Sequence, residues 1–497
     1  MRRTLTVLLL ILLCFSSFGL SNSVQPSKLS PRLWQVYQSA TPDDEYLVWV
    51  YFTDKGRNLS AKYAAARQVL TLKSRQRRLT MRRPENLVDF ADLPLEDSYV
   101  MAVQQHVQQF RHASKWLNAV SARATKRQID LIRRFEFVKV IDLVGRFKSI
   151  APEPVEQPDL SLPPASGVDQ AQSQSALDYG PSFTQLNQIN VPAVHNLGDF
   201  GQGVVIAVLD AGFNNLGHEA FQRMHIIAAR DFVNGDDDVG DGQDMGNGSH
   251  GTATLSVIGG FAPGKLIGPA FSADYILAKT ENTDSERPVE EDNWVAGLEW
   301  AEGSGVDVMS SSVGYLDFDP GFGGYSWADM NGQTAVTTRA AVMAAQRGIV
   351  VVNAAGNSGG NPIHNTLIAP ADGDGVIAAG AVHFDGERAG FSSVGPTVDG
   401  RIKPDVMALG VGVQTASPRT RSGYQPLPGT SFACPLVAGT AALILSAHPD
   451  WSPTQVLNAL RSTASNAATP NNLTGWGIVN ALAAVQFSSK RQGASSK

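Results

Sequence analysis

The stretch GTSFACPLVAGTAALIL, residues 429–445, decides the fold of this chain. Mostly small and apolar residues follow Ser431 up to His448 and Pro449, and a run of this length predicts a buried helix. Ser431 would lie in the first turn of that helix, where free backbone N–H groups and the positive end of the dipole stabilise a developing negative charge. A serine there is either an ordinary N-cap or a nucleophile that already has half of an oxyanion hole.

Two upstream segments supply what a nucleophilic serine needs, a base to take its proton and an acid to orient that base. Residues 204–209, VVIAVL, are typical of a strand buried on both faces in a parallel sheet, and Asp210 follows at its carboxyl end. Open α/β sheets place their sites at that end. Residues 249–253, SHGTA, begin a short helix with His250 at its start.

Each of these residues also has a plainer interpretation. An aspartate two residues before a glycine, as in DAG at 210–212, is common as a turn after a strand, and a histidine can cap a helix. His218 and His225 are alternative bases that lie nearer to Asp210 in the chain. The order and local context of Asp210, His250 and Ser431 together favour a catalytic set.

The three segments VLDAG (208–212), HGT (250–252) and GTSFACP (429–435) resemble the signature blocks of the subtilisin-like serine proteases, the subtilase family or peptidase S8. The resemblance runs from about residue 180 to residue 485. It implies an α/β catalytic domain with a doubly wound, mostly parallel sheet. It also implies that Asp210 orients the base, that His250 is the general base and then the acid, and that Ser431 is the nucleophile.

A fourth segment is similar to the family's oxyanion block. Residues 348–352, GIVVV, predict another buried strand, and NAAGN follows at residues 353–357. Asn357 matches the family's oxyanion asparagine, whose amide donates a hydrogen bond beside the backbone N–H of Ser431. The alternative is a turn at the end of a strand, where Gly-Asn is common.

The resemblance also implies where a peptide substrate lies. A predicted strand at residues 305–314 ends in small residues, and this end pairs with extended substrate. Residues opposite wall the pocket for the side chain before the scissile bond. Small residues there, together with main-chain pairing, predict broad specificity. The floor is expected within residues 365–375, where Asp372 favours basic side chains if it points into the pocket and is otherwise a solvated loop acid. The substrate residues implied in this way are Ser312, Val313, Gly314, Ala354, Ala355 and Gly356.

This chain departs from the family pattern at three positions. Cys434 and Leu436 stand where the nucleophile block usually has Ser and His. Cys434 lies one helical turn after Ser431, and we interpret it as a core residue rather than a site residue. Ala211 stands where Thr or Ser is usual, which removes one hydrogen bond but no catalytic group.

The chain of 497 residues divides into five segments. A positively charged start and an apolar run predict a secretory signal peptide over residues 1–23. A small α+β unit at 24–144 is similar to the inhibitory prodomains of the family, a Pro-rich linker covers 145–179, and a disordered tail (486–497) follows the catalytic domain (180–485). In the prodomain we expect strands at 46–52, 116–122 and 137–141 and helices at 99–110 and 125–134.

Charge separates the prodomain from the enzyme. Residues 24–177 hold 22 Lys and Arg against 16 Asp and Glu, a net charge of +6, whereas residues 178–497 hold 16 against 30, a net charge of −14. A basic prodomain is attracted to an acidic enzyme and can act as an intramolecular inhibitor. The basic run at residues 73–83 lacks stacking aromatics, so we interpret it as a solvated or protease-sensitive helix face and predict no nucleic-acid partner.

The remaining predictions concern cofactors, compartment and state. The loop 231–248 contains Asp236, Asp237, Asp238, Asp241 and Asp244. Calcium binding there is an alternative to a solvated turn, and no cofactor is required. Only Cys434 remains after signal cleavage, so we predict no intramolecular disulfide. We expect a soluble monomer, secreted to an extracellular or periplasmic space, with no membrane contact after cleavage.

The function that these observations predict is a secreted serine endopeptidase, made as an autoprocessed precursor, that acts on protein or peptide substrates. A catalytically silent peptide-binding protein of the same fold is the alternative from another class. An esterase of the α/β-hydrolase fold would have Gly at position 433, where this chain has Ala433. An acid peptidase with carboxylates as base and oxyanion donor is disfavoured by His250 and Asn357.

Overall fold

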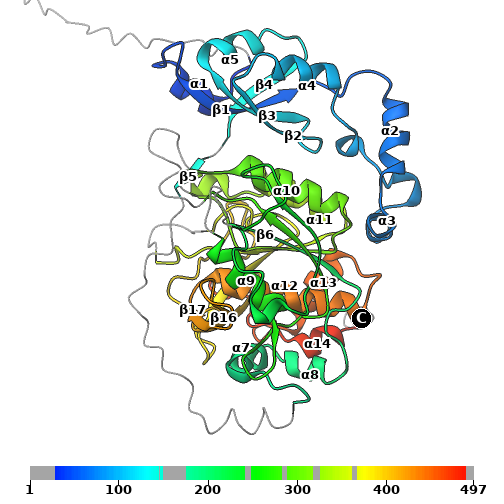
Figure 1. The fold of residues 1–497 in the computed structure, drawn as a ribbon, viewed down its shortest axis with the longest axis vertical. Coiled ribbons are helices and arrows are strands. Elements are labelled where there is room, and N and C mark those ends of the chain that lie inside the picture. The colour runs from blue at the N-terminus through cyan, green and yellow to red at the C-terminus, as the bar shows by residue number, and fades with distance from the viewer. Residues whose placement is uncertain are drawn as a thin grey trace, which may run out of the picture.

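The structure is a computed structural model that describes residues 28–144, 146–148, 175–240, 248–282, 288–316, 325–360 and 367–488. It has a smaller N-terminal part, the prodomain, seated on a larger catalytic domain (Figure 1). The predicted signal peptide, most of the predicted linker and the end of the predicted tail lie outside the described residues.

The catalytic domain is built on a seven-stranded sheet in which every pair of neighbouring strands is parallel. The strand order is β15-β14-β13-β12-β6-β10-β7. The predicted doubly wound α/β fold is therefore confirmed. The strands are β6 (Val205–Asp210), β7 (His225–Asp231), β10 (Asp274–Lys279), β12 (Val308–Ser311), β13 (Val350–Ala354), β14 (Val376–Val382) and β15 (Val406–Leu409).

Helices cover both faces of this sheet, which is why its central strands are apolar throughout instead of alternating. In β6, Ile206 and Val208 enter the core that contains α9 (Ser249–Gly259) and α12 (Thr430–Ala447). Ala207 and Leu209 enter the core on the other face, with α10 (Glu291–Gly303) and α11 (Val336–Ala345). Successive residues of a strand point to opposite faces, so β6 serves two cores at once.

Helix α12 fills the middle of the first core, and its residues from Thr430 to Leu445 are buried. Among the described residues it is the one helix long and apolar enough to cross a membrane, and it is almost wholly inside the protein. Pro435 lies inside it and has no N–H for the carbonyl of Ser431. The Ser312 hydroxyl donates to that carbonyl instead, at 2.8 Å.

Shorter elements complete the catalytic domain. Two-stranded ribbons join β8 to β9 and β16 to β17. These elements are α7 (Phe183–Gln188), α8 (Val191–His195), α13 (Pro453–Thr463), α14 (Ala481–Val485), β8 (Phe261–Ala262), β9 (Leu266–Ile267), β16 (Val413–Ala416), β17 (Tyr424–Leu427), and the 3-10 turns η3 (Gly180–Ser182), η4 (Glu219–Phe221) and η5 (Trp327–Asp329).

The prodomain has a four-stranded antiparallel sheet in the order β2-β3-β1-β4. In β1, Val48 and Val50 belong to the prodomain's own core, whereas Leu47 and Trp49 belong to the core shared with α10 and α11. The sheet therefore rests directly on the catalytic domain (Figure 1). The elements are β1 (Glu45–Phe52), β2 (Gln109–Ser114), β3 (Ala119–Thr125), β4 (Val138–Leu143), α1 (Pro31–Tyr37), α4 (Asp97–Gln104) and α5 (Lys126–Ile132).

Two predicted prodomain elements were wrong in their bounds. The helix expected at 99–110 ends at Gln104, and residues 109–114 form β2. The strand expected at 116–122 begins only at Ala119, because Trp116 and Leu117 lie in the preceding turn and pack on the catalytic domain. Apolar residues that pack on another domain do not follow the hydrophobic periodicity of a strand or helix. The apolar run at Trp116 and Leu117 was therefore predicted as part of the strand.

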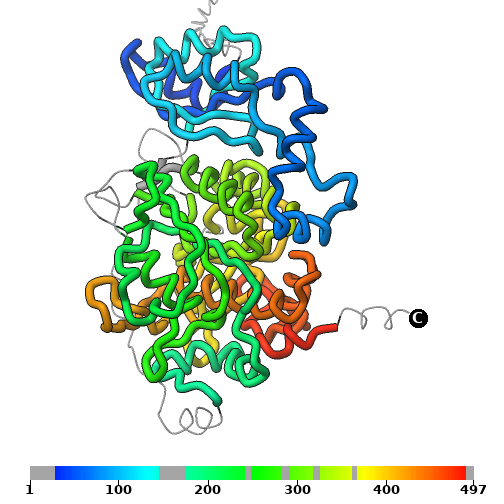
Figure 2. The backbone as a smooth tube through the Cα atoms, turned by 45° about the vertical axis from the view of Figure 1, so that its right-hand side comes forward, coloured from blue at the N-terminus to red at the C-terminus, as the bar shows by residue number. Residues whose placement is uncertain are grey.

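A helical arm leaves the prodomain between β1 and α4. It consists of α2 (Leu59–Gln68), α3 (Leu72–Leu79) and the 3-10 turns η1 (Pro84–Asn86) and η2 (Phe90–Asp92). Figures 1 and 2 show it descending along one flank of the catalytic domain. The prediction of a solvated basic helix is wrong for Arg77 and Arg78, which are buried.

The predicted linker at 145–179 contains a strand at its start. Residues Arg146–Lys148 form β5, which pairs antiparallel with β11 (Pro288–Glu290) of the catalytic domain. At the linker's other end, Tyr179 is fully buried in the catalytic core. The segment that leaves the prodomain is thus held by the catalytic domain as an added strand.

Candidate active site

Asp210 lies at the carboxyl end of β6 and its side chain is fully buried. Three donors surround its carboxylate. The backbone N–H of Ala211 donates to Oδ1 at 2.7 Å, and the Thr254 hydroxyl donates to Oδ2 at 2.9 Å. The third partner is the His250 ring, whose Nδ1 lies 2.6 Å from Oδ1. A buried carboxylate with this many hydrogen bonds is held in one orientation.

His250 lies in the first turn of α9, with its side chain 29% exposed. A Cβ at the next residue, Gly251, would lie 2.2 Å from the carbonyl oxygen of Gly212, so only glycine lets α9 approach the end of β6 this closely. Burial lowers the pKa of His250, but the charge and hydrogen bond of Asp210 raise it by more. The pKa of His250 therefore lies above its ordinary value of 6.5.

The two alternative histidines have other partners. His218 is buried, and its ring bonds the carbonyl of Gly423 and the N–H of Ala220. His225 lies on the exposed edge strand β7 and contacts Asp274 at 2.7 Å. The structure thus brings His250, and neither of these two, to Asp210.

Ser431 lies in the first turn of α12, as the sequence predicts, and is 9% exposed. Its hydroxyl donates to the carbonyl of Ser312 at 3.2 Å. The next residue, Phe432, has its ring centroid 5.9 Å from that of His250, so the start of α12 lies against the base. Asp210, His250 and Ser431 therefore come from three elements that meet at the carboxyl edge of the sheet.

Asn357 lies just beyond the end of β13 and is exposed. Its Oδ1 accepts two hydrogen bonds from Thr430, one from the backbone N–H at 2.9 Å and one from the hydroxyl at 2.8 Å. These bonds fix which end of the amide is the donor. The Nδ2 group lies near the start of α12, 3.7 Å from where a Cβ on Gly429 would be.

The two predicted substrate segments, 312–314 and 354–356, are linked by backbone hydrogen bonds to a third segment at residues 368–369. Tyr315 and Ala369 exchange two backbone hydrogen bonds of 2.8 Å, which ties the strand end at 312–314 to the segment near 369. The N–H of Ile368 donates to the carbonyl of Ala355 at 3.2 Å, which ties in residues 354–356. Both predicted substrate segments are thus held next to residues 368–369.

Asp372 takes neither of the two places considered for it. It is fully buried, and its carboxylate accepts hydrogen bonds from the Thr338 hydroxyl at 2.6 Å and the Gly332 N–H at 2.8 Å. Burial raises its pKa, and the two hydrogen bonds oppose that shift. The prediction of a solvated loop acid is wrong, because Asp372 is an internal link between α11 and the loop before it.

Cys434 is buried in the α12 core, as interpreted from the sequence. Its Sγ lies 3.4 Å from the carbonyl oxygen of Ser311 and 3.8 Å from the Ser310 hydroxyl. Burial raises the pKa of the thiol to about 12, so it stays protonated.

The sequence interpretation missed two residues that hold the site together. The Thr254 hydroxyl donates a hydrogen bond to Asp210. Ala211, the residue after Asp210, has no hydroxyl that could do so. Thr430 orients Asn357. The missing hydroxyl at Ala211 was the available signal that another donor was needed. The residue that supplies it, Thr254, lies in another element, one helical turn after His250.

Two acids of the acidic loop form ion pairs with basic residues of β7 and β10 where the loop is described. Asp231 is paired with the buried Lys279 at 2.9 Å, and Asp237 is paired with Arg230 at 3.2 Å. Asp241 and Asp244 lie outside the described residues. Across the parts of the chain that the structure describes, no group of three or more His, Cys, Asp or Glu is arranged to hold a metal ion.

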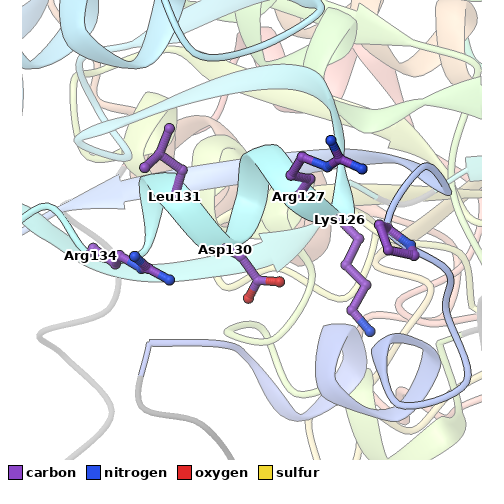
Figure 3. A pocket seen from close by; sticks show the side chains of 6 residues that line it. Lys126, Arg127, Asp130, Leu131 and Arg134 are labelled. Atoms are coloured by element: carbon purple, nitrogen blue, oxygen red, sulfur yellow. The ribbon is translucent and has the colours of Figure 1, made fainter.

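A hollow on the prodomain surface has no part in this site. Figure 3 shows it on α5, with side chains of both charges along its rim. Its lining belongs entirely to the prodomain, whereas the triad candidates all belong to the catalytic domain. The lining residues are Pro42, Lys126, Arg127, Asp130, Leu131 and Arg134.

Comparisons with known proteins agree with this geometry. The sequence model of the subtilase family matches residues 201–477, and that of the peptidase S8 propeptide domain of Bacteroidota matches residues 47–158. An alkaline protease of Shouchella clausii is 30% identical over 368 residues, which is 74% of this chain and 85% of that protein. Subtilisin BL of Lederbergia lenta is 33% identical over 61% of this chain and 97% of its own length. Subtilisin DY of Bacillus licheniformis is 35% identical over 60% of this chain and 96% of its own length.

With a protease domain and a propeptide both matched, this chain belongs to the subtilase family and is a subtilisin-like serine endopeptidase made as a precursor.

Proposed function

We propose that the protein is a secreted endopeptidase that cleaves peptide bonds through Asp210, His250 and Ser431 and matures by cutting its own linker. The contact of 2.6 Å between Asp210 Oδ1 and His250 Nδ1, beside a serine at a helix start, carries this proposal. Export is supported by the charged and apolar N-terminal segment, residues 1–23.

Each residue has one role in the reaction. The Ser431 hydroxyl leaves the carbonyl of Ser312, gives its proton to His250 Nε2 and attacks the carbonyl carbon of the substrate. Asp210 holds the Nδ1–H tautomer and stabilises the imidazolium that forms. His250 then protonates the leaving amine, and a water molecule repeats the cycle on the acyl-enzyme to release the acid and restore Ser431.

The oxyanion of the tetrahedral intermediate is stabilised by two donors, the backbone N–H of Ser431 and the amide of Asn357. The first is one of the free N–H groups at the start of α12. The second faces the same helix start because Thr430 occupies the Asn357 Oδ1. Donors that are already oriented need no reorganisation when the charge develops.

Autoprocessing is supported by the pairing of β5 with β11. An extended peptide that adds a strand to a domain is one of the recurring modes of peptide recognition, and Arg146–Lys148 do this within the precursor. The chain that follows continues into the Pro-rich linker. Residues 146–148 of the precursor are thus held as an extended strand on the catalytic domain, and cleavage in the linker that follows would free that domain.

The pH profile of peptide hydrolysis tests the proposed base. His250 must be neutral to accept a proton, and its pKa is raised above 6.5. We therefore expect kcat/KM to fall about tenfold per pH unit as the pH drops below that raised pKa. The measurement uses an uncharged peptide substrate between acid and alkaline pH. An optimum at acid pH would contradict the histidine base and support the acid-peptidase alternative.

Replacing Asn357 by alanine tests the oxyanion donor. We expect kcat to fall about 10²–10³-fold with little change in KM, a magnitude that comes from the corresponding asparagine of subtilisin. Ser358→Ala, which alters the adjacent exposed side chain, is the matched control and should leave kcat near the wild-type value. Equal kcat values for the two variants would remove Asn357 from the mechanism.

The alternative of a silent peptide-binding protein predicts substrate binding without turnover at any pH. Calcium binding by the acidic loop stays a prediction, tested by comparing the thermal unfolding midpoint with calcium and with a chelator.

Broad specificity likewise stays a prediction, supported by the small residues of both substrate segments.

A further inference from the structure

The helical arm of the prodomain contacts the catalytic domain at the edge of the sheet opposite the triad. Its partners are Gly203, Val306 and Arg347, which precede β6, β12 and β13, whereas Asp210 ends β6. Val205 and Asp210, at the two ends of β6, are five residue steps apart, about 17 Å at 3.3 Å per step. The arm therefore binds the enzyme without touching the triad.

Arg77 makes the central contact. Its guanidinium donates to the Glu302 carboxylate at 2.5 Å, to the carbonyl of Arg347 at 3.1 Å and to the carbonyl of Val306. The side chains of Arg77 and Glu302 are 4% and 1% exposed. Removing one partner of a charge pair that is shielded from water in this way costs far more than breaking a surface ion pair, because the other charge stays buried without it.

The adjacent Arg78 and the catalytic domain's Arg347 complete a reciprocal exchange of charges. Arg78 bonds Glu302 at 3.0 Å and holds Asp92 of the arm by two bonds of 2.9 Å. Arg347 in turn enters the prodomain, where it bonds Asp92 and Asp89 at 2.9 Å each. The prodomain and the catalytic domain thus each supply an arginine that pairs with carboxylates of the other.

The arm also fits the backbone of the catalytic domain. Gly348 has φ +88°, and a Cβ there would lie 2.6 Å from the carbonyl oxygen of Arg77, so a glycine is needed for the approach of α3. Ser74 donates to the carbonyl of Glu302 at 3.0 Å, and Lys73 pairs with Asp307 at 2.7 Å. The arm and this edge of the catalytic domain are thus complementary in shape, in backbone hydrogen bonding and in charge.

We infer that this edge of the catalytic domain, formed by Glu302, Asp307 and the carbonyls of Val306 and Arg347, is a docking surface for the arm that retains the prodomain after the linker is cut. The inference rests on the proposed function only in taking the prodomain as the inhibitor. The prodomain then has two anchors. One is its sheet on α10 and α11, and the other is the arm, which adds affinity from a position remote from catalysis.

Release is controlled by this second anchor because the arm cannot leave until the buried bonds of Arg77 and Arg78 to Glu302 are broken. Truncating one partner of a buried, hydrogen-bonded charge pair acts mainly on the dissociation rate. We expect Arg77→Ala to speed dissociation of the cut prodomain roughly 30- to 1,000-fold. Lys73→Ala removes a partly exposed pair and should speed it about two- to fivefold.

The experiment uses the precursor with Ser431→Ala and a recognition sequence for an added protease placed between residues 150 and 174. The linker is cut with that protease, and gel filtration at increasing salt follows separation of the two fragments. Because the cut does not depend on Ser431, the result is independent of whether the protein processes itself. Arg75→Ala is the matched control, since Arg75 lies on the same helix but is exposed.

The expected result is that the unsubstituted and Arg75→Ala fragments elute together at salt concentrations where the Arg77→Ala fragments separate. If Arg77→Ala prevents folding, Lys73→Ala at the half-exposed rim still reports on the anchor through its smaller, salt-dependent effect. Fragments of the Arg77→Ala and Lys73→Ala precursors that stay together as firmly as those of Arg75→Ala would overturn the inference.

Discussion

Replacing Ser431 by alanine is expected to lower kcat for peptide hydrolysis by about 10⁶-fold, the magnitude known for the nucleophile of subtilisin. Alanine removes the attacking oxygen and leaves the apolar contacts of α12 in place. The precursor should therefore fold and keep its full length, whereas the wild-type precursor sheds the residues before its catalytic domain. Intact mass spectrometry of both proteins, made without the signal peptide, separates these outcomes.

Ser446→Ala is the control for this experiment, because Ser446 lies at the other end of the same helix and donates to the carbonyl of Gln202. It should mature as the wild type does. If the Ser431→Ala precursor also shortened itself, Ser431 would not be the nucleophile. If neither the wild type nor the variant shortened or hydrolysed peptides, the silent peptide-binding alternative would gain support.

Asp210→Asn should produce the second largest effect, a fall in kcat of about 10⁴-fold with KM little changed, as for the equivalent change in another serine protease. Asparagine keeps the shape of the side chain. The amide, however, carries no charge to stabilise the His250 imidazolium, and its NH₂ group favours the wrong tautomer of the ring. Steady-state kinetics on the mature enzyme measure the split between kcat and KM.

The chain offers a matched control in a second aspartate–histidine pair. Asp274 contacts His225 at 2.7 Å on the exposed edge of the sheet, outside the site. Asp274→Asn therefore removes the same kind of contact, and kcat should stay near the wild-type value. A similar loss in both variants would indicate a general effect on stability and would argue against the role assigned to Asp210.

Much of the catalytic domain could be predicted because its signals are local. The apolar runs before Asp210 and Asn357 mark strands buried on both faces, and the residue after such a strand lies at a predictable edge of the sheet. The apolar run after Ser431 similarly marks the start of α12. The signals at Asp210 and Ser431, together with the segment HGT at 250–252 between them, were enough to indicate the family.

The prodomain was harder to predict for a physical reason. Several of its apolar residues face another domain, so Trp116 and Leu117 follow no helical or strand period of the prodomain itself. The arginines of the arm were predicted to be solvated, whereas Arg77 and Arg78 are buried. A basic run is ordinarily solvated, and only the presence of Glu302, 225 residues away from Arg77, makes burial of this one favourable.

By itself the sequence determined the fold class, the positions of Asp210, His250 and Ser431 at the ends of their elements, and the division into a basic prodomain and an acidic enzyme. Only the tertiary structure decided that Thr254 holds Asp210, that Thr430 orients Asn357, that Asp372 is internal, and that the arm grips the far edge of the sheet. The reason is that hydrophobic period and chain order are properties of neighbouring residues. The partner of a buried polar group lies instead on whichever element the fold brings beside it.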